Sequence, residues 1–462
     1  MSPTLFTRTA FQPATIINTW VPAWIQFVVH DLLDHNQDFN GQELRIGSQT
    51  LYKTVPIPGF PNVYGNRLDH FLDGTPAYSF TKTKGALLRL PDGSLSLPDD
   101  YLPLDGNIEA LGVQENIWFG LSMITYILAK EHNAVVKMFH TKYPNWSGDE
   151  CFDKARLVVS ALVAKIQGLE WTKAIIQNPI GQYARDHMFY GLLGKESRKK
   201  SGVQKWLGNY ICGIWGGNLE YRGVKYATTE EFVSVYRMHS LLPESFTVRS
   251  FNDNSNLVTF DLKDAIFEGS PKVNTNVSHL DMVYSMGTSF PGALVLNNYP
   301  SALRSVQPLQ YHHSIDLAAV DIIRDRERGV PRYNAFRRSL LLTPIKTWND
   351  LTSDPAVIAK LQQVYGNDVE LLDLLVGTTA EEKLPGFVFG ETIYTVFVVQ
   401  TQRRIESDRF FTEDFRPEVY TPEGYNWVES TTFASILLRH YPSLKKYLNE
   451  TDNAFLPWKA KN

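Results

Sequence analysis

The sequence predicts a mainly α-helical protein in one large domain, with a few short β hairpins, and three observations support this prediction. Apolar residues recur at i, i+3 and i+4 in the most strongly patterned segments, as expected for helices with a buried face. The connectors between these segments are rich in glycine, proline and asparagine. The chain has no internal repeat and no linker long enough to separate domains. We therefore expect residues 1–462 to form a single domain, with 1–19 as an N-terminal extension.

The expected helices follow one another along the whole chain. The first, over 20–34, is apolar enough to be buried, and Pro22 suits the first turn of a helix. The other segments with helical periodicity are 116–139, 153–176, 228–241, 317–328, 392–410 and 430–448. The main connectors are 55–66, 90–106 and 250–276. A short β hairpin is expected near 86–97, where Pro91, Asp92 and Gly93 form a turn signal.

The composition excludes several classes of protein. A chain of 462 residues with 43% hydrophobic residues can bury an extensive core. The formal net charge of −4 argues against a nucleic-acid binder, which usually carries a basic excess. Two cysteines, Cys151 and Cys212, are too few for a disulfide framework or a cysteine-rich metal site. No segment has the pattern of a secretory signal or of a membrane span, so we expect a cytoplasmic protein.

The segment around His30 contains the first candidate chemical group. Gln26 and His30 lie four residues apart, on one face of an otherwise apolar expected helix. A histidine beside a glutamine suits a pocket for a small polar molecule, with His30 as a general base. The alternative is a core histidine whose ring nitrogens are satisfied by neighbouring groups, and these residues taken alone favour that alternative.

A second candidate site lies in the segment 235–243. Tyr236 and His239 are three residues apart, so on one helix both would project toward the same face. A histidine can ligate iron through Nε2 while its other ring nitrogen donates to an acceptor that fixes the tautomer. A tyrosine one turn away would lie close enough to a haem for electron transfer. The alternative is a structural tyrosine–histidine pair on a buried helix.

Several motifs in one order carry a resemblance to a known family. They are Trp-Ile-Gln-Phe-Val-Val-His-Asp at 24–31, Tyr-Arg-Met-His-Ser-Leu-Leu-Pro at 236–243, and the segments 130–133, 324–334 and 403–411. From about Trp20 to the C-terminus, the chain resembles the peroxidase–cyclooxygenase haem superfamily, and most closely the fatty-acid α-dioxygenases. The resemblance implies a large, helical haem peroxidase-like domain. It also reverses the balance between the functional and structural interpretations of the two candidate sites.

The resemblance implies a haem b held between two histidines. His30 would be the distal acid and base, His239 the proximal iron ligand, and Gln26 a residue of the distal pocket. Asn334 would accept the N–H of the proximal ring, which holds the ring and tunes the iron. Mammalian relatives esterify an acidic residue just before the distal histidine to the haem. Val29 occupies that position here, so we expect a non-covalent haem.

The resemblance also implies a Ca²⁺ site. Family members combine the aspartate after the distal histidine, here Asp31, with a loop of alternating oxygen donors. The matching loop offers Asp69, the carbonyl of Phe71, Asp73 and Thr75. Oxygen donors at alternate positions suit a hard cation, although an Asp-Gly-Thr stretch by itself is usually only a turn. Asp69 replaces the threonine that is usual at the first position of the loop.

The implied activity depends on Tyr236. Peroxide would oxidise the haem, the haem would oxidise Tyr236, and the tyrosyl radical would remove a hydrogen from the Cα of a fatty acid. Oxygen would then add at that carbon to give a 2-hydroperoxy acid, which can lose CO₂ and form a shorter aldehyde. The expected partners are a free fatty acid, O₂ and a peroxide activator. The fatty acid would come from solution or from peripheral contact with a membrane surface.

Three positions match the residues that hold the substrate carboxylate. Arg404 can clamp a carboxylate with two parallel hydrogen bonds, and Thr172 can donate a third. The alternative for Arg404 is a surface ion pair with Asp408, four residues further on. Gln167 departs from the family pattern, because plant members have a histidine there. A glutamine can donate a neutral hydrogen bond but cannot supply the charge of an imidazolium.

Other functions remain open at this point. The chain could be a haem peroxidase that oxidises small reductants with H₂O₂, or a fatty-acid dioxygenase that acts at another carbon. It could also be a haem protein for binding or sensing, without catalysis. The joint occurrence of Tyr236, Thr172 and Arg404 favours the α-dioxygenase.

Overall fold

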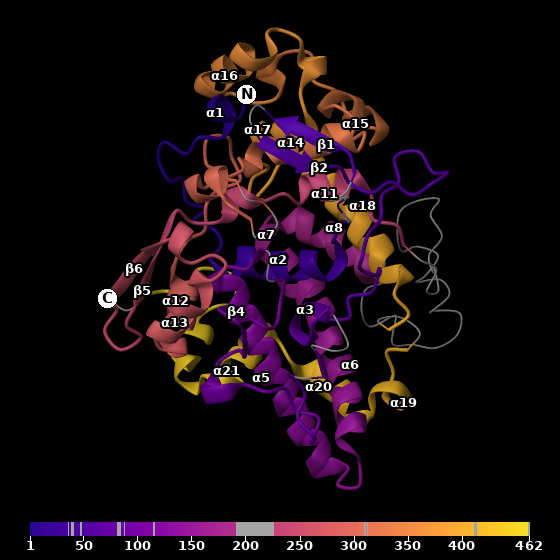
Figure 1. Ribbon diagram of the computed structural model, residues 1–462, viewed down its shortest axis with the longest axis vertical. Coiled ribbons are helices and arrows are strands. Elements are labelled where there is room, and N and C mark those ends of the chain that lie inside the picture. Colours follow the sequence, from indigo (N-terminus) through magenta and orange to yellow (C-terminus); the bar gives the residue numbers. More distant parts are fainter. Residues whose placement is uncertain are drawn as a thin grey trace.

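The computed structural model describes residues 1–35, 37, 41–46, 49–80, 85, 86, 88–113, 116–190, 226–308, 311, 313–410 and 414–460, of which 185–190, 402, 405 and 406 by backbone alone. Helices dominate these residues, and the strands form three separate two-stranded antiparallel hairpins (Figure 1). The predicted mainly α fold with a few short hairpins is therefore confirmed.

The helices are distributed along the whole described chain. The α-helices are α1 Ser2–Phe6, α2 Trp20–Leu32, α3 Thr75–Tyr78, α5 Phe119–Lys142, α6 Gly148–Ile166, α7 Thr172–Ile175, α8 Pro179–Tyr190, α11 Glu230–Val235, α12 Gly269–Asn276, α13 His279–Thr288, α14 Leu317–Glu327, α15 Tyr333–Ser339, α16 Pro355–Tyr365, α17 Leu374–Ala380, α18 Glu391–Ser407, α19 Pro417–Tyr420, α20 Pro422–Ser430, α21 Phe433–His440 and α22 Lys445–Leu448. The short 3₁₀ turns are Pro98–Asp100, His239–Leu241, Leu262–Asp264, Ser301–Ser305, Trp348–Asp350, Val369–Leu371 and Pro442–Leu444, and η3, Gln167–Trp171, is a π-helical turn.

The hairpins lie only partly where the sequence predicts them. The pairs are β1 Glu43–Ile46 with β2 Gln49–Tyr52, β3 Leu104–Asp105 with β4 Ile108–Glu109, and β5 Ser245–Arg249 with β6 Asn256–Asp261. The hairpin expected near 86–97 is reduced to one bridge, between Arg89 and Leu95, and Gly93 turns the chain there at φ +87°. The expected connector 250–276 is wrong, because it contains β6 and α12.

Helix α2 crosses the middle of the molecule and is buried on almost every side (Figure 1). Trp20, Trp24 and Phe27 are fully buried, and both tryptophans contact the ring of Phe433 on α21. Fully burying a side chain of this size stabilises the fold by roughly 2–3 kcal/mol. The helix packs against α5 and the π-helical turn. The predicted buried helix at 20–34 is confirmed, and its position brings its polar residues to interior sites.

Helices α5 and α6 pack side by side and extend together toward one end of the molecule (Figure 1). A capping box starts α6: Ser147 Oγ accepts from the Glu150 N–H at 3.2 Å, and the Glu150 carboxylate accepts from the Ser147 N–H at 2.8 Å. The helix then passes into the π-helical turn and α7. Such turns insert one residue into a helix and often occur at functional sites. No helix in the described residues is long and apolar enough to cross a membrane.

The N-terminal residues are part of the packed domain. Leu5 and Phe6 of α1 belong to the main hydrophobic core, and Phe6 contacts the ring of Tyr299 edge-on. The Arg8 guanidinium donates to backbone carbonyls of Ser240 and Leu242 at 3.2 and 3.0 Å. The segment expected as an extension therefore supports the stretch of chain that follows His239.

Glu170 in the π-helical turn generates a prediction about pH. Its carboxylate accepts from the Phe433 N–H at 3.0 and 3.2 Å at the start of α21. Burial nevertheless raises the pKa of Glu170 to about 7, and the Phe433 N–H and Lys165 only partly offset this effect. The unfolded chain has an ordinary pKa of about 4.3. The folded state therefore binds more protons than the unfolded state between these values, and the wild type should lose stability as pH rises from about 4 to 7.

The Glu170→Gln variant should lack this particular loss, because its amide oxygen still accepts from Phe433 and does not ionise. Urea unfolding of both proteins between pH 4 and 8 measures the effect. The stability of the variant relative to the wild type should increase with pH across that range. A difference that is the same at pH 4 and pH 8 would contradict the assignment.

Candidate active site

Gln26 and His30 of α2 line a cavity of about 630 Å³, within the size range of cofactor sites. His239 and Arg237 line the same cavity, together with Asp321 of α14. The apolar lining includes the whole of a small hydrophobic cluster, formed by Leu51, Val306, Tyr311, Ile315 and Val320. The structure therefore brings the two histidines singled out by the sequence to one largely apolar chamber.

His30 is neutral in this environment. Its side chain is buried, and its Nε2 accepts from the Nδ2 amide of Asn116 at 3.0 Å. Because Nε2 accepts, the proton of the neutral ring is on Nδ1, which is buried and has no hydrogen-bond partner among the described residues. Burial, with a smaller contribution from His239, lowers the pKa of His30 to about 4. His30 can therefore act as a proton acceptor at neutral pH.

Gln26 positions the group that faces His30. Its Oε1 accepts from the indole N–H of Trp118 at 2.7 Å, and its Nε2 donates to the backbone carbonyl of Asn116 at 3.0 Å. Asn116 and Trp118 were not predicted as site residues. The available signal was weak, because both precede the start of α5 and the sequence pattern placed Asn116 inside that helix.

A buried carboxylate orients His239. The Nδ1 N–H donates to Asp321 Oδ2 at 3.0 Å, and the Tyr299 hydroxyl donates to the same oxygen at 3.0 Å. Arg237 pairs with the other oxygen of Asp321. Burial opposes ionisation of Asp321, but His239 and Arg237 outweigh it and lower its pKa to about 2. With Nδ1 held in this way, Nε2 is the nitrogen that can bind a metal in the cavity.

The expectation for Asn334 is wrong. Its Nδ2 donates to the Ile345 carbonyl and to Glu370, both at 2.9 Å, and its Oδ1 accepts from the Ile345 N–H at 2.9 Å. These bonds tie the start of α15 to the loop that follows it and to the turn Val369–Leu371, and none of them goes to His239. Asp321 has the role expected of Asn334. An acidic residue on the buried face of the expected helix 317–328 was the signal that could have identified it.

Tyr236 and His239 do not share a helix face, so this expectation is also wrong. Helix α11 ends at Val235, and Tyr236 has φ −87° and ψ 2°, outside the helical region. The chain passes through Met238, with φ −88° and ψ 36°, before the 3₁₀ turn at His239–Leu241. His239 lines the chamber with His30, whereas Tyr236 lines a separate, smaller cavity.

The Tyr236 cavity has a volume of about 40 Å³ and is lined by Gln167 and Arg404 as well as apolar residues of α2. Tyr236 is buried, and its ring stacks on Phe232 at a centroid distance of 4.1 Å. Burial raises the pKa of Tyr236, although the Thr401 side chain and Arg404 act in the opposite direction. The phenol is therefore protonated at neutral pH, and losing an electron would require losing its proton as well.

Arg404 is a buried cation next to this phenol. Its guanidinium donates to the Thr228 hydroxyl at 3.0 Å and to the carbonyl of His70, and lies 5.5 Å from the centre of the Tyr226 ring. Burial lowers the pKa of Arg404, but a guanidinium remains protonated at neutral pH. A cation that lines a cavity and bonds mainly to neutral groups can bind an anion that enters the cavity.

Gln167 and Thr172 are adjacent but have different surroundings. The Trp24 indole N–H donates to Gln167 Oε1 at 3.0 Å, so the amide nitrogen of Gln167 is the group that can donate into the cavity. The Thr172 hydroxyl donates to the backbone carbonyl of Gln167 at 2.7 Å. Thr172 is fully buried and is not among the described lining residues of the cavity. In this structure it supports the π-helical turn and does not reach the space beside Tyr236.

The expected calcium loop lies against α2. Asp31 Oδ2 accepts from the Gly74 N–H at 3.0 Å, and Asp73 Oδ1 accepts from the Thr75 N–H at 2.9 Å. The Asp69 carboxylate accepts from the Phe71 N–H at 2.8 Å, a bond within one turn. Among the described residues no group of three His, Cys, Asp or Glu side chains has the arrangement of a metal site. A cation here would therefore need carbonyl and hydroxyl oxygens in addition to carboxylates.

Burial and the nearby Asp73 carboxylate raise the pKa of Asp31 well above its ordinary value. Asp31 Oδ1 is buried without a hydrogen-bond partner among the described residues. An unpartnered buried oxygen next to a second carboxylate fits a bound cation. Arg156 already pairs with Asp73 at 2.6 Å, however, and supplies part of the positive charge.

Comparison with known proteins identifies the family. The sequence pattern of the family described as animal haem peroxidase matches residues 45–455, so the chain belongs to that family. The α-dioxygenase PIOX of Oryza sativa is 37% identical over 96% of this chain and 76% of its own length. Alpha-dioxygenase 2 of Arabidopsis thaliana is 34% identical over 94% of this chain and 74% of its own length. Within the family, the chain belongs to the α-dioxygenases.

Solved structures agree with this placement. The crystal structure of the fatty acid α-dioxygenase of Oryza sativa superposes with a TM-score of 0.90 at 35% identity, covering all of this chain and 80% of the other. A tyrosine-to-phenylalanine variant of the rice enzyme has been solved with palmitic acid and superposes equally well. The family implies a haem. The chamber fits one, because it contains an imidazole held by a carboxylate at Nδ1 and a second, neutral imidazole.

The partners of His239 generate a prediction about haem binding. Asp321→Asn should weaken haem affinity about ten- to hundredfold, the usual cost of losing a residue that orients a metal ligand. Asn334→Ala should not change the haem affinity of the folded protein, because the hydrogen bonds of Asn334 go to Ile345 and Glu370 and not to His239. Titration of each purified variant with haem, followed by Soret absorbance, measures both values. Equal affinities in wild type and Asp321→Asn, with a loss in Asn334→Ala, would reverse the assignment.

Proposed function

We propose that this protein is a haem-dependent fatty-acid α-dioxygenase that converts a fatty acid and O₂ into a 2-hydroperoxy fatty acid. One observation carries the proposal: Tyr236, Arg404 and Gln167 line the same buried cavity. A carboxylate held by Arg404 and the Gln167 amide would have its Cα next to the phenol of Tyr236. That position selects the α carbon and no carbon further along the chain.

The charge of the site supports binding of a carboxylate. Arg404 is buried, so an anion that replaces water at the guanidinium gains a charge-assisted interaction in a poorly solvated place. Gln167 contributes a neutral donor, which gives orientation with less affinity than a second cation would give. We therefore expect weaker substrate binding than in plant relatives, in which a histidine occupies this position.

The size of the cavity limits it to the head of the substrate. Its volume of about 40 Å³ is small beside the 710 Å³ of an adjoining cleft, so it can hold the carboxylate end of a fatty acid but not the hydrocarbon chain. Tyr226 and Thr228 line both this cavity and the cleft. We propose that the hydrocarbon chain extends past these two residues into the cleft.

His30 would handle the proton of the activating peroxide. Its neutral ring can accept a proton from hydrogen peroxide and return it to the departing oxygen. His239 would hold the haem iron through Nε2 while Asp321 keeps the ring in place. When bound, the haem would supply the one-electron oxidation of Tyr236. Because Val29 has no carboxylate at the position used for an ester link, we propose that the haem is bound non-covalently.

Tyr236 would carry the radical. Loss of one electron and the phenolic proton gives a tyrosyl radical, which takes a hydrogen atom from Cα and re-forms the phenol. The Cα radical combines with O₂, and the peroxyl radical takes the hydrogen atom back from Tyr236. The product is the 2-hydroperoxy acid, and the radical is regenerated. Loss of CO₂ and water from this product leaves an aldehyde one carbon shorter.

We also propose a structural Ca²⁺ at Asp31. The unpartnered Asp31 oxygen, the Phe71 carbonyl, Asp73 and the Thr75 hydroxyl would supply its donors, as a hard cation prefers. The ion would fix the loop that precedes α3 against the last turn of α2 and so hold His30 in position.

Removal of the metal tests the calcium proposal. EGTA should lower the Tm of the wild type by several degrees, because a ligand that binds only the folded state stabilises it. Asp31→Asn should contain less calcium by mass spectrometry and should not respond to EGTA. Asp34→Asn, at a residue paired with Arg67 outside the loop, should respond like the wild type. A wild-type Tm that does not change with EGTA or added Ca²⁺ would contradict the proposed Ca²⁺ site.

The Tyr236→Phe variant tests the reaction. It should keep the haem Soret band, because Tyr236 lines a different cavity from His30 and His239. Its oxygen uptake with palmitate should fall to background, since phenylalanine cannot form the radical. An oxygen electrode and the Soret spectrum measure both properties. Normal oxygen uptake by this variant would disprove the radical mechanism.

Arg404→Ala separates a dioxygenase from a plain peroxidase. A clamp on the substrate carboxylate predicts that kcat/KM for palmitate falls about ten- to hundredfold, the value of one or two hydrogen bonds to a charge. Oxidation of guaiacol with H₂O₂ should change little, since that reaction requires only the chamber of His30. An unchanged kcat/KM for palmitate in Arg404→Ala would contradict the carboxylate clamp, whereas a wild type that oxidises guaiacol but does not turn over palmitate would be a peroxidase that acts on small reductants.

A further inference from the structure

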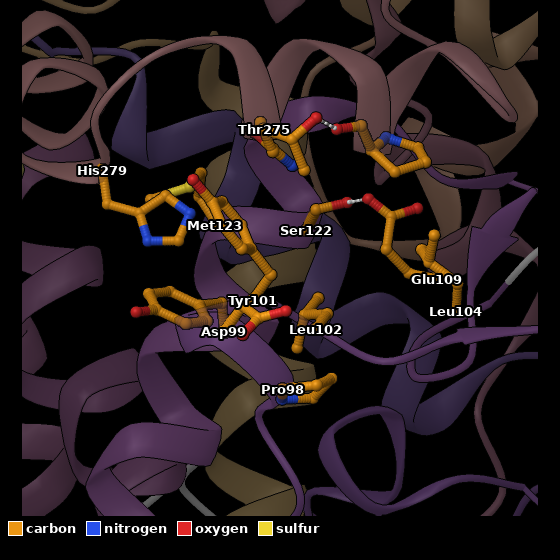
Figure 2. A pocket seen from close by; sticks show the side chains of 13 residues that line it. Pro98, Asp99, Tyr101, Leu102, Leu104, Glu109, Ser122, Met123, Thr275 and His279 are labelled. Atoms are coloured by element: carbon orange, nitrogen blue, oxygen red, sulfur yellow. Dashed lines mark hydrogen bonds between the residues drawn. The ribbon is translucent and has the colours of Figure 1, made fainter.

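A separate cavity of about 230 Å³ is lined by residues of α5 and of the segments that pack against it (Figure 2). Its described lining comes from α5, from α12 and α13, and from the chain between Pro98 and Glu109. It shares no described lining residue with the two cavities of the active site. Neither the haem chemistry nor the clamp for a fatty-acid carboxylate explains this cavity.

The deep end of the cavity is lined by buried side chains whose oxygen atoms can accept hydrogen bonds. Glu109 is only 2% exposed, and Ser122 Oγ and Ser270 Oγ donate to its Oε1 at 2.7 and 2.9 Å. Asn274, 7% exposed, also lines the cavity, and its buried Oδ1 has no hydrogen-bond partner among the described residues. In Figure 2 the Ser122–Glu109 pair lies to the right of the cavity. This end therefore suits a ligand that donates hydrogen bonds.

Aromatic rings form the opposite side. His279 lies 4.7 Å from the ring centre of Tyr101 and 4.3 Å from that of Tyr126. Figure 2 shows His279 and Tyr101 on the left, away from the carboxylate. Leu102, Leu104 and Met123 complete an apolar wall. Faces of tyrosine rings attract cations as well as apolar groups.

The charge of the lining favours a cation. The described lining contains two carboxylates, Glu109 at the deep end and Asp99 at the mouth, and no lysine or arginine. Burial lowers the pKa of His279 to about 4, so its ring is neutral at neutral pH. Lys130, which follows the lining residue Tyr126 by one turn, is not part of the lining and donates to Asp100 at 2.9 Å. A positive group in the cavity would therefore meet attraction on two sides.

The loop that places Asp99 at the mouth has an unusual backbone. Asp99 and Asp100 have φ values of +51° and +65°, a left-handed conformation that costs about 1 kcal/mol or more for each non-glycine residue. Lys130 holds Asp100 in this geometry, and Asp99 remains exposed at the rim. A strained pair of acidic residues at the entrance of a cavity is consistent with recognition of a positive ligand.

We propose that this cavity is a binding site for a small organic cation, a primary ammonium group carried on a compact aromatic or aliphatic body. The ammonium would donate to Glu109 and Asn274, and the body would lie against Tyr101, Tyr126 and His279. A cavity volume of about 230 Å³ has room for a small organic molecule such as phenethylamine.

Binding and ionisation of Glu109 would support each other. Burial raises the pKa of Glu109, although Ser122 and Ser270 lower it by donating to the carboxylate. An ammonium within hydrogen-bond distance would stabilise the ionised form further. The same interaction would be absent for a neutral alcohol of equal shape and repulsive for a carboxylate. The order of affinity among such isosteres therefore distinguishes this proposal from simple filling of an apolar cavity.

The test uses the full-length, haem-loaded protein and three probes of similar size: phenethylamine, 2-phenylethanol and 3-phenylpropanoate. Isothermal titration and ligand-observed NMR should show that the amine binds and that the carboxylate does not bind at this site. The alcohol should bind with an affinity about tenfold lower than that of the amine, or lower still. Equal affinity for amine and alcohol, or preference for the carboxylate, would overturn the proposal. So would failure of phenethylamine to bind at millimolar concentration.

Two variants locate the binding. Glu109→Gln keeps the shape and removes the charge, and should weaken amine binding about tenfold or more. Thr275→Phe fills the cavity from its exposed rim, so it tests the site even if Glu109→Gln fails to fold. Glu418→Gln, at an exposed residue elsewhere, is the matched control and should bind like the wild type. Unchanged amine affinity in Thr275→Phe would place the binding elsewhere and disprove the assignment.

Discussion

Helix α2 has almost no solvent-exposed face, so each of its side chains must find a partner inside the protein. This constraint organises the candidate site, because successive residues of a helix point about 100° apart. Gln26 and His30 line the haem chamber, Ile25 and Val29 line the Tyr236 cavity, and Asp31 accepts from the Gly74 N–H in the loop before α3. The Trp24 indole N–H donates to the side-chain amide of Gln167, which belongs to the π-helical turn. One buried helix thus holds the haem chamber, the Tyr236 cavity and the loop before α3 in a fixed relation.

The two cavities differ in the charged groups that line them. In the chamber, the buried Asp321 balances Arg237 and holds His239, so the ring nitrogen offered to a metal keeps one orientation. In the smaller cavity, the Arg404 guanidinium donates to two neutral groups, the Thr228 hydroxyl and the His70 carbonyl. Separating Tyr236 from His239 by a break in the helix permits this division. Two residues on one helix face would have opened onto the same space.

The sequence predicted what depends on local periodicity, including α2, α5, α6, α14 and α18, because a long apolar stripe at helical spacing rarely arises without a helix that buries it. The sequence did not predict features that depend on contacts between residues far apart in the chain. The break after Val235 has no proline or glycine to mark it, and its apolar pattern continues. Asp321 and Asn334 both lie near the expected proximal side, and only the packing of α14 decides which reaches His239. The strand β6 was missed because most of its residues are exposed and show no alternation.

The proposed reaction requires that the carboxylate clamp place Cα at the phenol of Tyr236. The most direct measurement uses palmitate with deuterium in both positions on C2, incubated with the haem-loaded enzyme and O₂ and followed by mass spectrometry and initial rates. We expect a 2-hydroperoxide or the C15 aldehyde that has lost one of the two deuterium atoms, formed more slowly than from unlabelled palmitate. A product that retains both deuterium atoms and carries oxygen further along the chain would contradict it.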